Sequence, residues 1–192
     1  MSARVDMIAG LGNPGSEYAN TRHNAGFWFV DEVVRKFGGN FKYERKFQGD
    51  VARSTIKGHQ VWLLKPDTFM NLSGQAVLAL MQFYKIKLEN ILVVHDDLDL
   101  PVGTLKLKLG GGHGGHNGLR DIISRCGGNG FQRIRLGIGH PGNKDKVTGH
   151  VLKKASRDDQ IAIENVIDQT ITELDQIVHG EISKAMQTLH TK

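Results

Sequence analysis

The sequence predicts an α/β protein with a single mixed, twisted β-sheet flanked by helices. Segments that read as strands alternate along the chain with segments of helical period. The wholly apolar run Ile91–Val94 is typical of a parallel strand that is covered on both faces. At 192 residues, with 39% hydrophobic and 23% charged residues, the chain suits one globular domain spanning residues 1–192.

The first predicted strand, Val5–Leu11, runs into Gly10–Gly15, which matches the pattern G-x-G-x-x-G. A dinucleotide site with this pattern needs a helix that opens within the glycines. Here a Pro-Gly turn follows, and the helical period starts only near His23. We therefore expect a tight turn that directs Asn13 into a cleft, in preference to a nicotinamide site.

A helix and two strands are predicted next. The helix has apolar residues on one face, at Phe27, Val30, Val33, Val34 and Phe37. Two glycines, residues 38–39, are expected to end it. Residues 41–57 and 60–65 alternate in polarity and predict two strands joined by a hairpin turn.

The middle of the chain predicts another helix and the strand at Ile91–Val94. The apolar face of the helix is formed by Val77, Leu80, Met81 and Tyr84. The strand leads directly into His95, Asp96 and Asp97. Open α/β sheets hold their sites at the carboxyl ends of strands, so we expect functional side chains here.

In the second half, residues 104–109 and 133–136 alternate basic with apolar side chains and predict two more strands. Asn117 is expected to cap a helix running to about Arg125, and residues 139–148 to form a loop. The segment from Ser156 resembles a capping box. It should open one long helix whose apolar face comprises Ile163, Val166, Ile167, Ile171, Leu174 and Val178.

Residues 110–118 contain six glycines, and the other three positions are His113, His116 and Asn117. Glycines lose much conformational freedom on folding, so a run of them indicates a structural need. That need is usually a positive φ or a close approach of the backbone to a ligand. A mobile linker is the alternative. Apolar segments follow at once on both sides, so we predict a structured wall of a site.

The positive charge of the chain is concentrated in one region. The net charge is +5 with a pI near 9.4. Residues 104–154 hold ten Lys or Arg against two Asp, a local charge of +8, whereas residues 155–192 carry −4. Four of these cations are expected on one sheet face: Lys106, Lys108, Arg133 and Arg135. They either protect exposed strands or, as we expect beside the glycine stretch, contact phosphate.

Other features narrow the class of protein. The single cysteine, Cys126, excludes an internal disulfide, suggests a reducing compartment and is expected in the core. Neither a signal peptide nor a membrane span is recognisable, so a cytoplasmic location is expected. The motifs G-x-S-x-G and G-x-x-x-x-G-K-[ST] are absent from the sequence.

The remaining candidates for chemistry are one histidine, one carboxylate and several carboxamides. His23 lies near a helix N-terminus, which favours the neutral imidazole, whereas a neighbouring Asp96 would favour the charged form. The sequence leaves open which influence prevails. Asn13, Asn71 and Asn117 each follow a Gly- or Pro-rich connection. They are either turn and cap residues or a set that positions water and stabilises an oxyanion.

Two alternatives have some support. His113 and His116 have the spacing H-x-x-H, with His95, Asp96 and Asp97 nearby in the expected fold, which would suit a metal-assisted hydrolase. The glycines between them disfavour a helix, and a carboxamide-lined site holds metal poorly, so no metal is expected. A non-catalytic nucleic-acid-binding module would use the basic face alone.

Five motifs, in this order and spacing, resemble the bacterial peptidyl-tRNA hydrolase family. They are Gly10–Gly15, Tyr18–Gly26, Lys65-Pro66 with Phe69-Met70-Asn71, His95–Asp99, and Gly110–Gly118 followed by Gly137–Pro141. The region 127–130 resembles the family less, and the chain after Lys154 matches only in general character.

The resemblance implies a single catalytic domain that cleaves the ester between a peptide and the 3′ ribose of tRNA. It implies that His23 is the general base for water, that Asp96 supports it, and that Asn13 senses the blocked α-amino group. Lys108 and Arg135 would clamp the 5′ phosphate. The 3′ end would be lined by Tyr18, Phe69, Met70, Asn71, His116 and Asn117. Family members act as monomers, without cofactor or metal.

Overall fold

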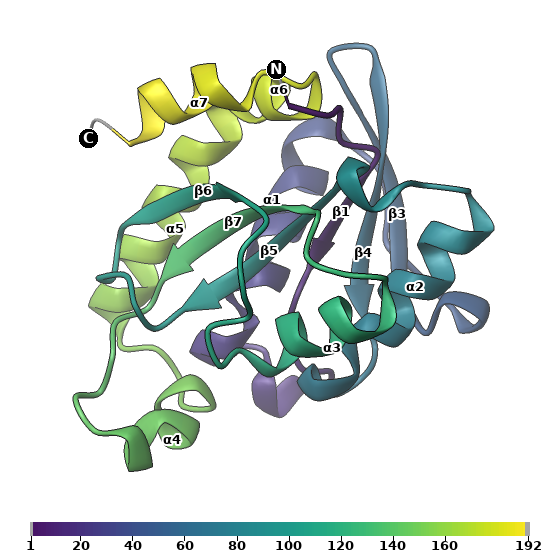
Figure 1. The fold of residues 1–192 in the computed structure, drawn as a ribbon. Helices are drawn as coiled ribbons and strands as arrows, with labels where there is room; N and C mark the ends of the chain where they lie inside the picture. The colour runs from purple at the N-terminus through teal and green to yellow at the C-terminus, as the bar shows by residue number, and fades with distance from the viewer. Residues whose placement is uncertain (1, 191–192) are drawn as a thin grey trace.

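The computed structural model describes residues 2–190 and contains one seven-stranded sheet of order β2-β3-β4-β1-β5-β7-β6 (Figure 1). The strands are β1 (Met7–Gly10), β2 (Lys42–Glu44), β3 (Gly49–Ile56), β4 (His59–Pro66), β5 (Ile91–Asp97), β6 (Leu105–Leu109) and β7 (Gln132–Gly137). The helices are α1 (Ala25–Phe37), α2 (Ser73–Phe83), α3 (Asn117–Arg125), α4 (Val147–Val151), α5 (Arg157–Thr172), α6 (Leu174–Val178) and α7 (Ile182–Leu189).

The sheet is mixed, as predicted. Its centre is parallel, because β1 pairs with β4 and β5, and β5 pairs with β7. The flanking pairs β2–β3, β3–β4 and β6–β7 are antiparallel. The carboxyl ends of β1, β4, β5 and β7 therefore meet at one end of the sheet, away from the two chain termini (Figure 1).

Helices cover both faces of the central strands, which confirms the predicted fold class. Apolar residues of α1, α5, α6 and α7 pack on one face, and those of α2 and α3 on the other. The run Ile91–Val94 is fully buried between these layers, as expected for a parallel strand covered on both faces. Within residues 2–190, no helix has the length and apolar character that a membrane span requires.

Several predicted boundaries are wrong for local reasons. The predicted strand 41–57 is interrupted by a 3-10 turn at Arg45–Phe47, because Phe47 turns inward to pack in the core and Gln48 takes a left-handed conformation. The predicted loop 139–148 contains a 3-10 turn and the start of α4.

The predicted long helix after Ser156 is two helices, α5 and α6. Ser156 caps α5 as expected, accepting the amide N–H of Asp159. Thr170 and Thr172 donate their hydroxyls to carbonyls three or four residues earlier, next to the break. Such bonds bend helices, and the bend turns Leu174 and Val178 toward the core.

Candidate active site

A cavity of about 560 Å³ lies at the carboxyl end of the parallel strands. One part of its wall comes from the loops after β1 and β4, another from β5 and β7, and a third from the glycine stretch and α4. Its lining includes the predicted residues Asn13, Tyr18, His23, Phe69, Met70, Asn71, Asp96, Lys108, His116, Asn117, Arg133 and Arg135. Residues scattered over the sequence thus converge on one cavity, and of the predicted set only Lys106 does not line it.

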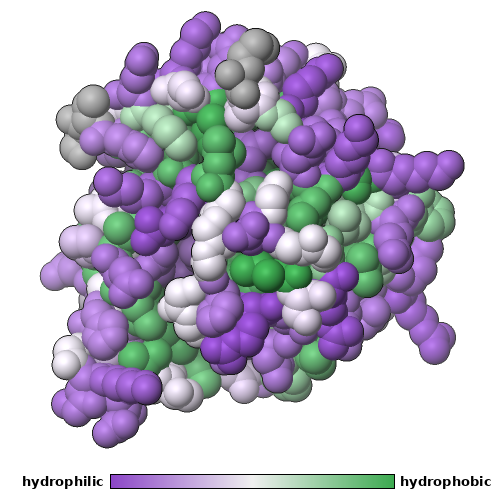
Figure 2. All heavy atoms as spheres, viewed as in Figure 1, coloured by the Kyte–Doolittle hydropathy of each residue, from purple (hydrophilic) through white to green (hydrophobic). Residues whose placement is uncertain are grey.

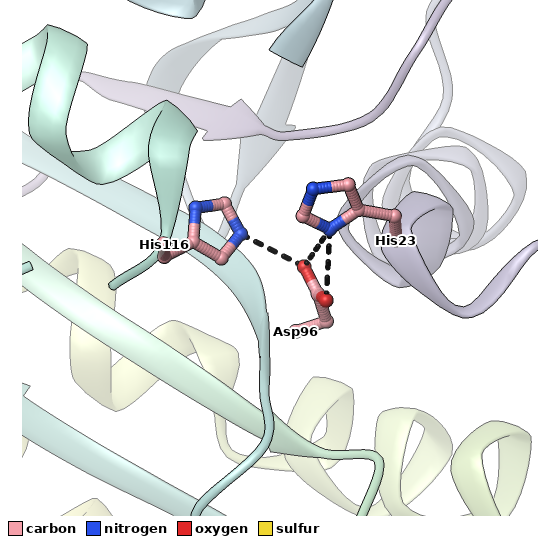
Figure 3. Close-up of side chains that lie close together, drawn as sticks. All are labelled: His23, Asp96 and His116. Carbon is pink, nitrogen blue, oxygen red and sulfur yellow. Dashed lines mark hydrogen bonds and ion pairs between the residues drawn. The ribbon is translucent and has the colours of Figure 1, made fainter. Parts of the chain in front are cut away.

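Asp96 lines this cavity together with His23 and His116 and is bonded to both imidazole rings (Figure 3). Its carboxylate lies 2.9 and 3.0 Å from Nδ1 of His23 and 2.8 Å from Nε2 of His116. Asp96 is at the end of β5, His23 lies in a 3-10 turn before α1, and His116 precedes α3. The predicted proximity of His23 and Asp96 is therefore present in the structure.

The hydrogen bonds assign a proton position to each ring. His116 Nδ1 accepts the amide N–H groups of Gly118 and Leu119, so Nε2 carries the hydrogen and donates to Asp96. His23 donates its Nδ1–H to the same carboxylate. The lone pair of neutral His23 is therefore on Nε2, which points away from Asp96 (Figure 3). This is the arrangement a general base requires.

His116, and not the predicted Asn117, is the N-cap of α3. Its ring takes the place of the side-chain oxygen that usually accepts the free N–H groups of a helix start. Because the same ring also donates to Asp96, the start of α3 is tied to the His–Asp pair.

The charges in this cluster move its pKa values in opposite directions. Burial lowers the pKa of His23, but attraction to Asp96 and the hydrogen bond to it are together stronger, so the pKa is raised above its usual value. Burial raises the pKa of Asp96, but the two histidines outweigh it and hold that pKa well below its usual range. The influence that opposes Asp96 at His23 is therefore burial, and not the helix N-terminus considered from the sequence.

His23, Asp96 and His116 also form the one group of three His, Cys, Asp or Glu residues within residues 2–190 that is compact enough for a metal ion. His113 is not part of it; its Nδ1 accepts the amide N–H of Gly115. A metal on Nε2 of His116 would displace the hydrogen that this ring donates to Asp96. The H-x-x-H pair of the metal alternative is therefore not assembled in this structure.

Two glycines allow His23 to approach Asp96. A Cβ atom at Gly10 would lie 2.3 Å from the carbonyl oxygen of Gly26, and one at Gly26 would lie 2.5 Å from the carbonyl oxygen of Val94. The start of α1 therefore packs directly on the backbone of β1 and β5. The G-x-G-x-x-G pattern serves this close packing and the turn that carries Asn13.

Asn13 is fixed by two partners. Its backbone forms a reciprocal pair of hydrogen bonds with the buried side chain of Asn24, and its side-chain Oδ1 accepts the amide N–H of Met70 at 2.6 Å. This bond turns Oδ1 toward the Met70 amide and leaves the NH₂ group of Asn13 available to donate into the cavity. Sequence reasoning missed Asn24, although its position directly after His23 offered a signal.

The other lining residues are more exposed. Asn71 and Asn117 are exposed at the starts of helical segments. Phe69 is 57% exposed, and its ring meets that of Tyr18 edge-on, with centroids 6.4 Å apart. Met70, the next residue, is buried in the core. This side of the cavity is thus an aromatic and carboxamide rim.

The predicted cationic band lies on β6 and β7, where Lys106 is opposite Arg135 and Lys108 is opposite Arg133. Arg133 differs from the others: it is 3% exposed, and its guanidinium donates to the carbonyls of Gly111 and Gly112. Arg135 bonds Asp97 through Nε at 2.7 Å. Neither lysine forms an ion pair within residues 2–190. The surrounding face is mostly hydrophilic, with apolar residues in separate patches (Figure 2).

A buried His–Asp pair that faces a cavity at the carboxyl end of an α/β sheet is the arrangement of an enzyme that uses an imidazole as an acid or a base. Comparison with known proteins then gives the family. A sequence model of the family described as peptidyl-tRNA hydrolase matches residues 7–192. This chain belongs to the peptidyl-tRNA hydrolase family, which confirms the predicted resemblance and the predicted enzyme class.

Individual relatives agree over their full length. The peptidyl-tRNA hydrolase of Neisseria meningitidis is 54% identical over 192 residues, covering all of both chains. That of Halorhodospira halophila is 56% identical over 184 residues, covering 96% of this chain and 95% of the relative. The crystal structure of peptidyl-tRNA hydrolase from Acinetobacter baumannii superposes with a TM-score of 0.95 at 49% identity, covering 98% of this chain and 96% of that one.

Proposed function

We propose that this protein hydrolyses the ester between the C-terminal carboxyl of a peptide and the 3′ ribose of tRNA, which recycles tRNA from prematurely released peptidyl-tRNA. The observation that carries the proposal is the His23–Asp96 pair, with the free Nε2 of His23 at a cavity that also holds carboxamides. Water and one base suffice for an ester, because a ribose oxygen leaves more readily than an amine.

In the proposed reaction, His23 Nε2 takes a proton from water as the water oxygen bonds to the ester carbonyl carbon. The resulting imidazolium is stabilised by Asp96, and the oxyanion by the NH₂ groups of Asn71 and Asn117. When the C–O bond to the ribose breaks, the imidazolium returns the proton to the leaving oxygen. No covalent enzyme intermediate forms.

Asn13 supplies the discrimination between blocked and free α-amino groups. Its Oδ1 is turned toward the Met70 amide, so the NH₂ donor is the group offered to the substrate. An N-acyl group offers that donor a carbonyl oxygen. A free aminoacyl ester instead carries a basic α-amino group, which is a hydrogen-bond donor when it is protonated. Donor would then face donor, and binding in the productive pose would be lost.

The basic band supports binding of the tRNA acceptor stem. We assign phosphate contacts to Lys106, Lys108 and Arg135, and hold Arg133 apart because its guanidinium already bonds the glycine stretch. Phosphate contacts position a nucleic acid without reading its sequence. This suits an enzyme that must accept many tRNAs.

We also propose that the protein acts as a monomer in the cytoplasm, without cofactor or metal. Its one cysteine, Cys126, is buried, and burial raises the pKa of the thiol to about 12. Such a thiol is unreactive, so no redox role is assigned to it.

The deciding experiment compares release of the ester from N-acetyl-aminoacyl-tRNA with release from the matching free aminoacyl-tRNA. We expect rapid hydrolysis of the first and little of the second, with activity unchanged after exhaustive chelation. Asn13→Asp is the informative variant, because a carboxylate accepts from Met70 and also attracts an ammonium. This variant should hydrolyse N-acetyl-aminoacyl-tRNA and free aminoacyl-tRNA at more similar rates than the unaltered protein does. Equal hydrolysis of both esters by the unaltered protein would contradict the proposed substrate class.

A further inference from the structure

Arg22, the residue before His23, is buried although it is the most polar side chain of its segment. It is 8% exposed and lies in the same 3-10 turn, Arg22–Asn24, that carries His23. A buried guanidinium needs partners that offset its lost hydration. The identity of those partners links two parts of the site.

The guanidinium joins the His23 turn to α4 and α5. Nη1 donates to the carbonyl of His150 in the last turn of α4 at 3.3 Å, and Nη2 donates to Asp159 in the first turn of α5 at 3.4 Å. A cation at the carboxyl end of a helix is favourably placed. Arg22 therefore holds the end of α4 against the segment that carries His23.

The backbone reinforces this connection. The amide N–H of Arg22 donates to the carbonyl of Lys153, that of Ala155 donates to Asn20, and Thr21 forms an antiparallel bridge with Lys154. The chain just after α4 is thus hydrogen-bonded to the chain just before His23. Figure 1 shows α4 at the end of the sheet where the parallel strands finish, beside the turns before α1.

α4 is also a wall of the cavity, which Val147, Thr148 and Val151 line. A substrate that fills the cavity therefore touches an element whose far end is held by Arg22. Displacement of that end would move the turn that places His23 on Asp96. Arg22 is the chain neighbour of His23, and its side chain donates to the end of α4.

We propose that Arg22 is a positioning residue that couples α4 to His23, so that α4 packed against substrate holds the imidazole on Asp96. This inference rests on the proposed function, since it assigns His23 the role of base. It adds a residue that touches neither water nor ester. Arg22 acts only through the place of its neighbour.

The test compares Arg22→Gln with Arg35→Gln. Arg35 is an exposed arginine on α1 that is likewise paired with an acid, Glu32, but has no bond to α4. For each variant, the pKa of the His23 ring is measured by NMR in the free protein, and kcat and KM are measured with N-acetyl-aminoacyl-tRNA. The NMR measurement needs no activity. An inactive unaltered protein would therefore refute the proposed function and leave the coupling still measurable.

The sign of the pKa change separates the explanations. If Arg22 positions His23, its loss weakens the Asp96 contact, burial then dominates, and the pKa of His23 falls. If only the charge of Arg22 mattered, its removal would raise that pKa. We expect a fall, with kcat reduced on the order of ten- to a hundredfold because small displacements of a base are costly, and no change for Arg35→Gln. A raised or unchanged pKa with kcat within twofold would overturn the proposal.

Two further variants complete the test. One guards against misfolding of Arg22→Gln, and the other perturbs α4 itself. Arg22→Lys keeps the charge but reaches one acceptor at a time, so it should show a smaller fall of the same sign. Val151→Ala loosens α4 and should also lower the pKa of His23. In the double variant with Arg22→Gln, we expect no further fall of this pKa beyond that of Arg22→Gln alone. Additive shifts in this double-mutant cycle would show that α4 and His23 are not coupled through Arg22.

Discussion

The cluster around Asp96 and the cationic band on β6 and β7 line the same end of the sheet but are built in opposite ways. In the cluster, Asp96 is 2% exposed and its carboxylate accepts hydrogen bonds from both His23 and His116. In the band, Lys106 and Lys108 are exposed and form no ion pair within the described residues. The groups proposed to do chemistry are held by the protein's own bonds, whereas the two lysines proposed to bind a polyanion are left for the ligand to pair; Arg135, which is bonded to Asp97, lies between these two cases.

This difference predicts separable effects. Substitution in the cluster should alter turnover and its pH dependence, because those bonds fix a proton. Substitution in the band should alter KM and its salt dependence, because screening acts on exposed charges.

The largest effect is expected for His23→Ala. Loss of the base should reduce kcat by roughly 10²–10⁴-fold, the usual contribution of general base catalysis. Binding of deacylated tRNA should be unchanged, since the band is intact. Single-turnover hydrolysis and a filter-binding titration measure the two quantities. Unchanged kcat would refute His23 as the base. A variant that still binds tRNA but no longer hydrolyses the ester would exclude the alternative that the protein is a non-catalytic binding module.

Asp96→Asn should have the next largest effect and should move the pH profile. Activity needs neutral His23, so it falls as pH drops through the pKa of that ring. Because Asp96 raises this pKa, the acid limb of the wild-type profile should lie above about pH 6.5, the ordinary histidine value. In the variant the charge is lost and burial remains, so the limb should move to lower pH while the plateau drops. A limb that stays in place would mean that another group titrates.

Much of the fold was predictable because its signals are local. Hydrophobic period and turn residues identified the buried strand at Ile91–Val94 and the capped start of α5 at Ser156. The interruption at Phe47 could not be predicted, because it depends on whether that ring finds space in the core. The break after Thr172 could not be predicted either, because the apolar residues on both sides of it fit the face of one uninterrupted helix.

The residues that meet in the cavity were largely predictable from the sequence, whereas their roles stay predictions. Asp96 ends a predicted strand and His23 precedes a predicted helix at the same end of the sheet, so their proximity followed from topology. The direction of the His23 pKa did not, because burial and charge oppose each other and their sizes depend on distances. Arg133 and Arg135 alternate identically in sequence, yet only Arg133 lies under the glycine stretch, and nothing local distinguishes them.

Arg133→Gln therefore tests whether Arg133 belongs with the cluster around Asp96 or with the cationic band. If Arg133 belongs with the built cluster, its loss frees the carbonyls of Gly111 and Gly112 and loosens the segment that leads to His116. We expect kcat to fall by roughly tenfold, within the range for misplaced catalytic groups, with the salt dependence of KM unchanged. A shallower salt dependence with normal kcat would return Arg133 to the phosphate band, as the sequence pattern predicted.

The smallest effects are expected within the band, where Lys108 and Lys106 form a matched pair two residues apart on β6. Lys108 lines the cavity and packs against Gly111, whereas Lys106 does not line it. Lys108→Ala should raise KM on the order of threefold to tenfold and reduce the slope of log KM against log salt by about 1, as loss of one phosphate contact does. Lys106→Ala should change both less, because Lys106 does not line the cavity. Both should leave kcat at saturation unaltered, since neither touches Asp96 or its two rings. Equal effects of the two substitutions would show that the band acts as a diffuse field, and a fall in kcat would show that it takes part in placing the ester.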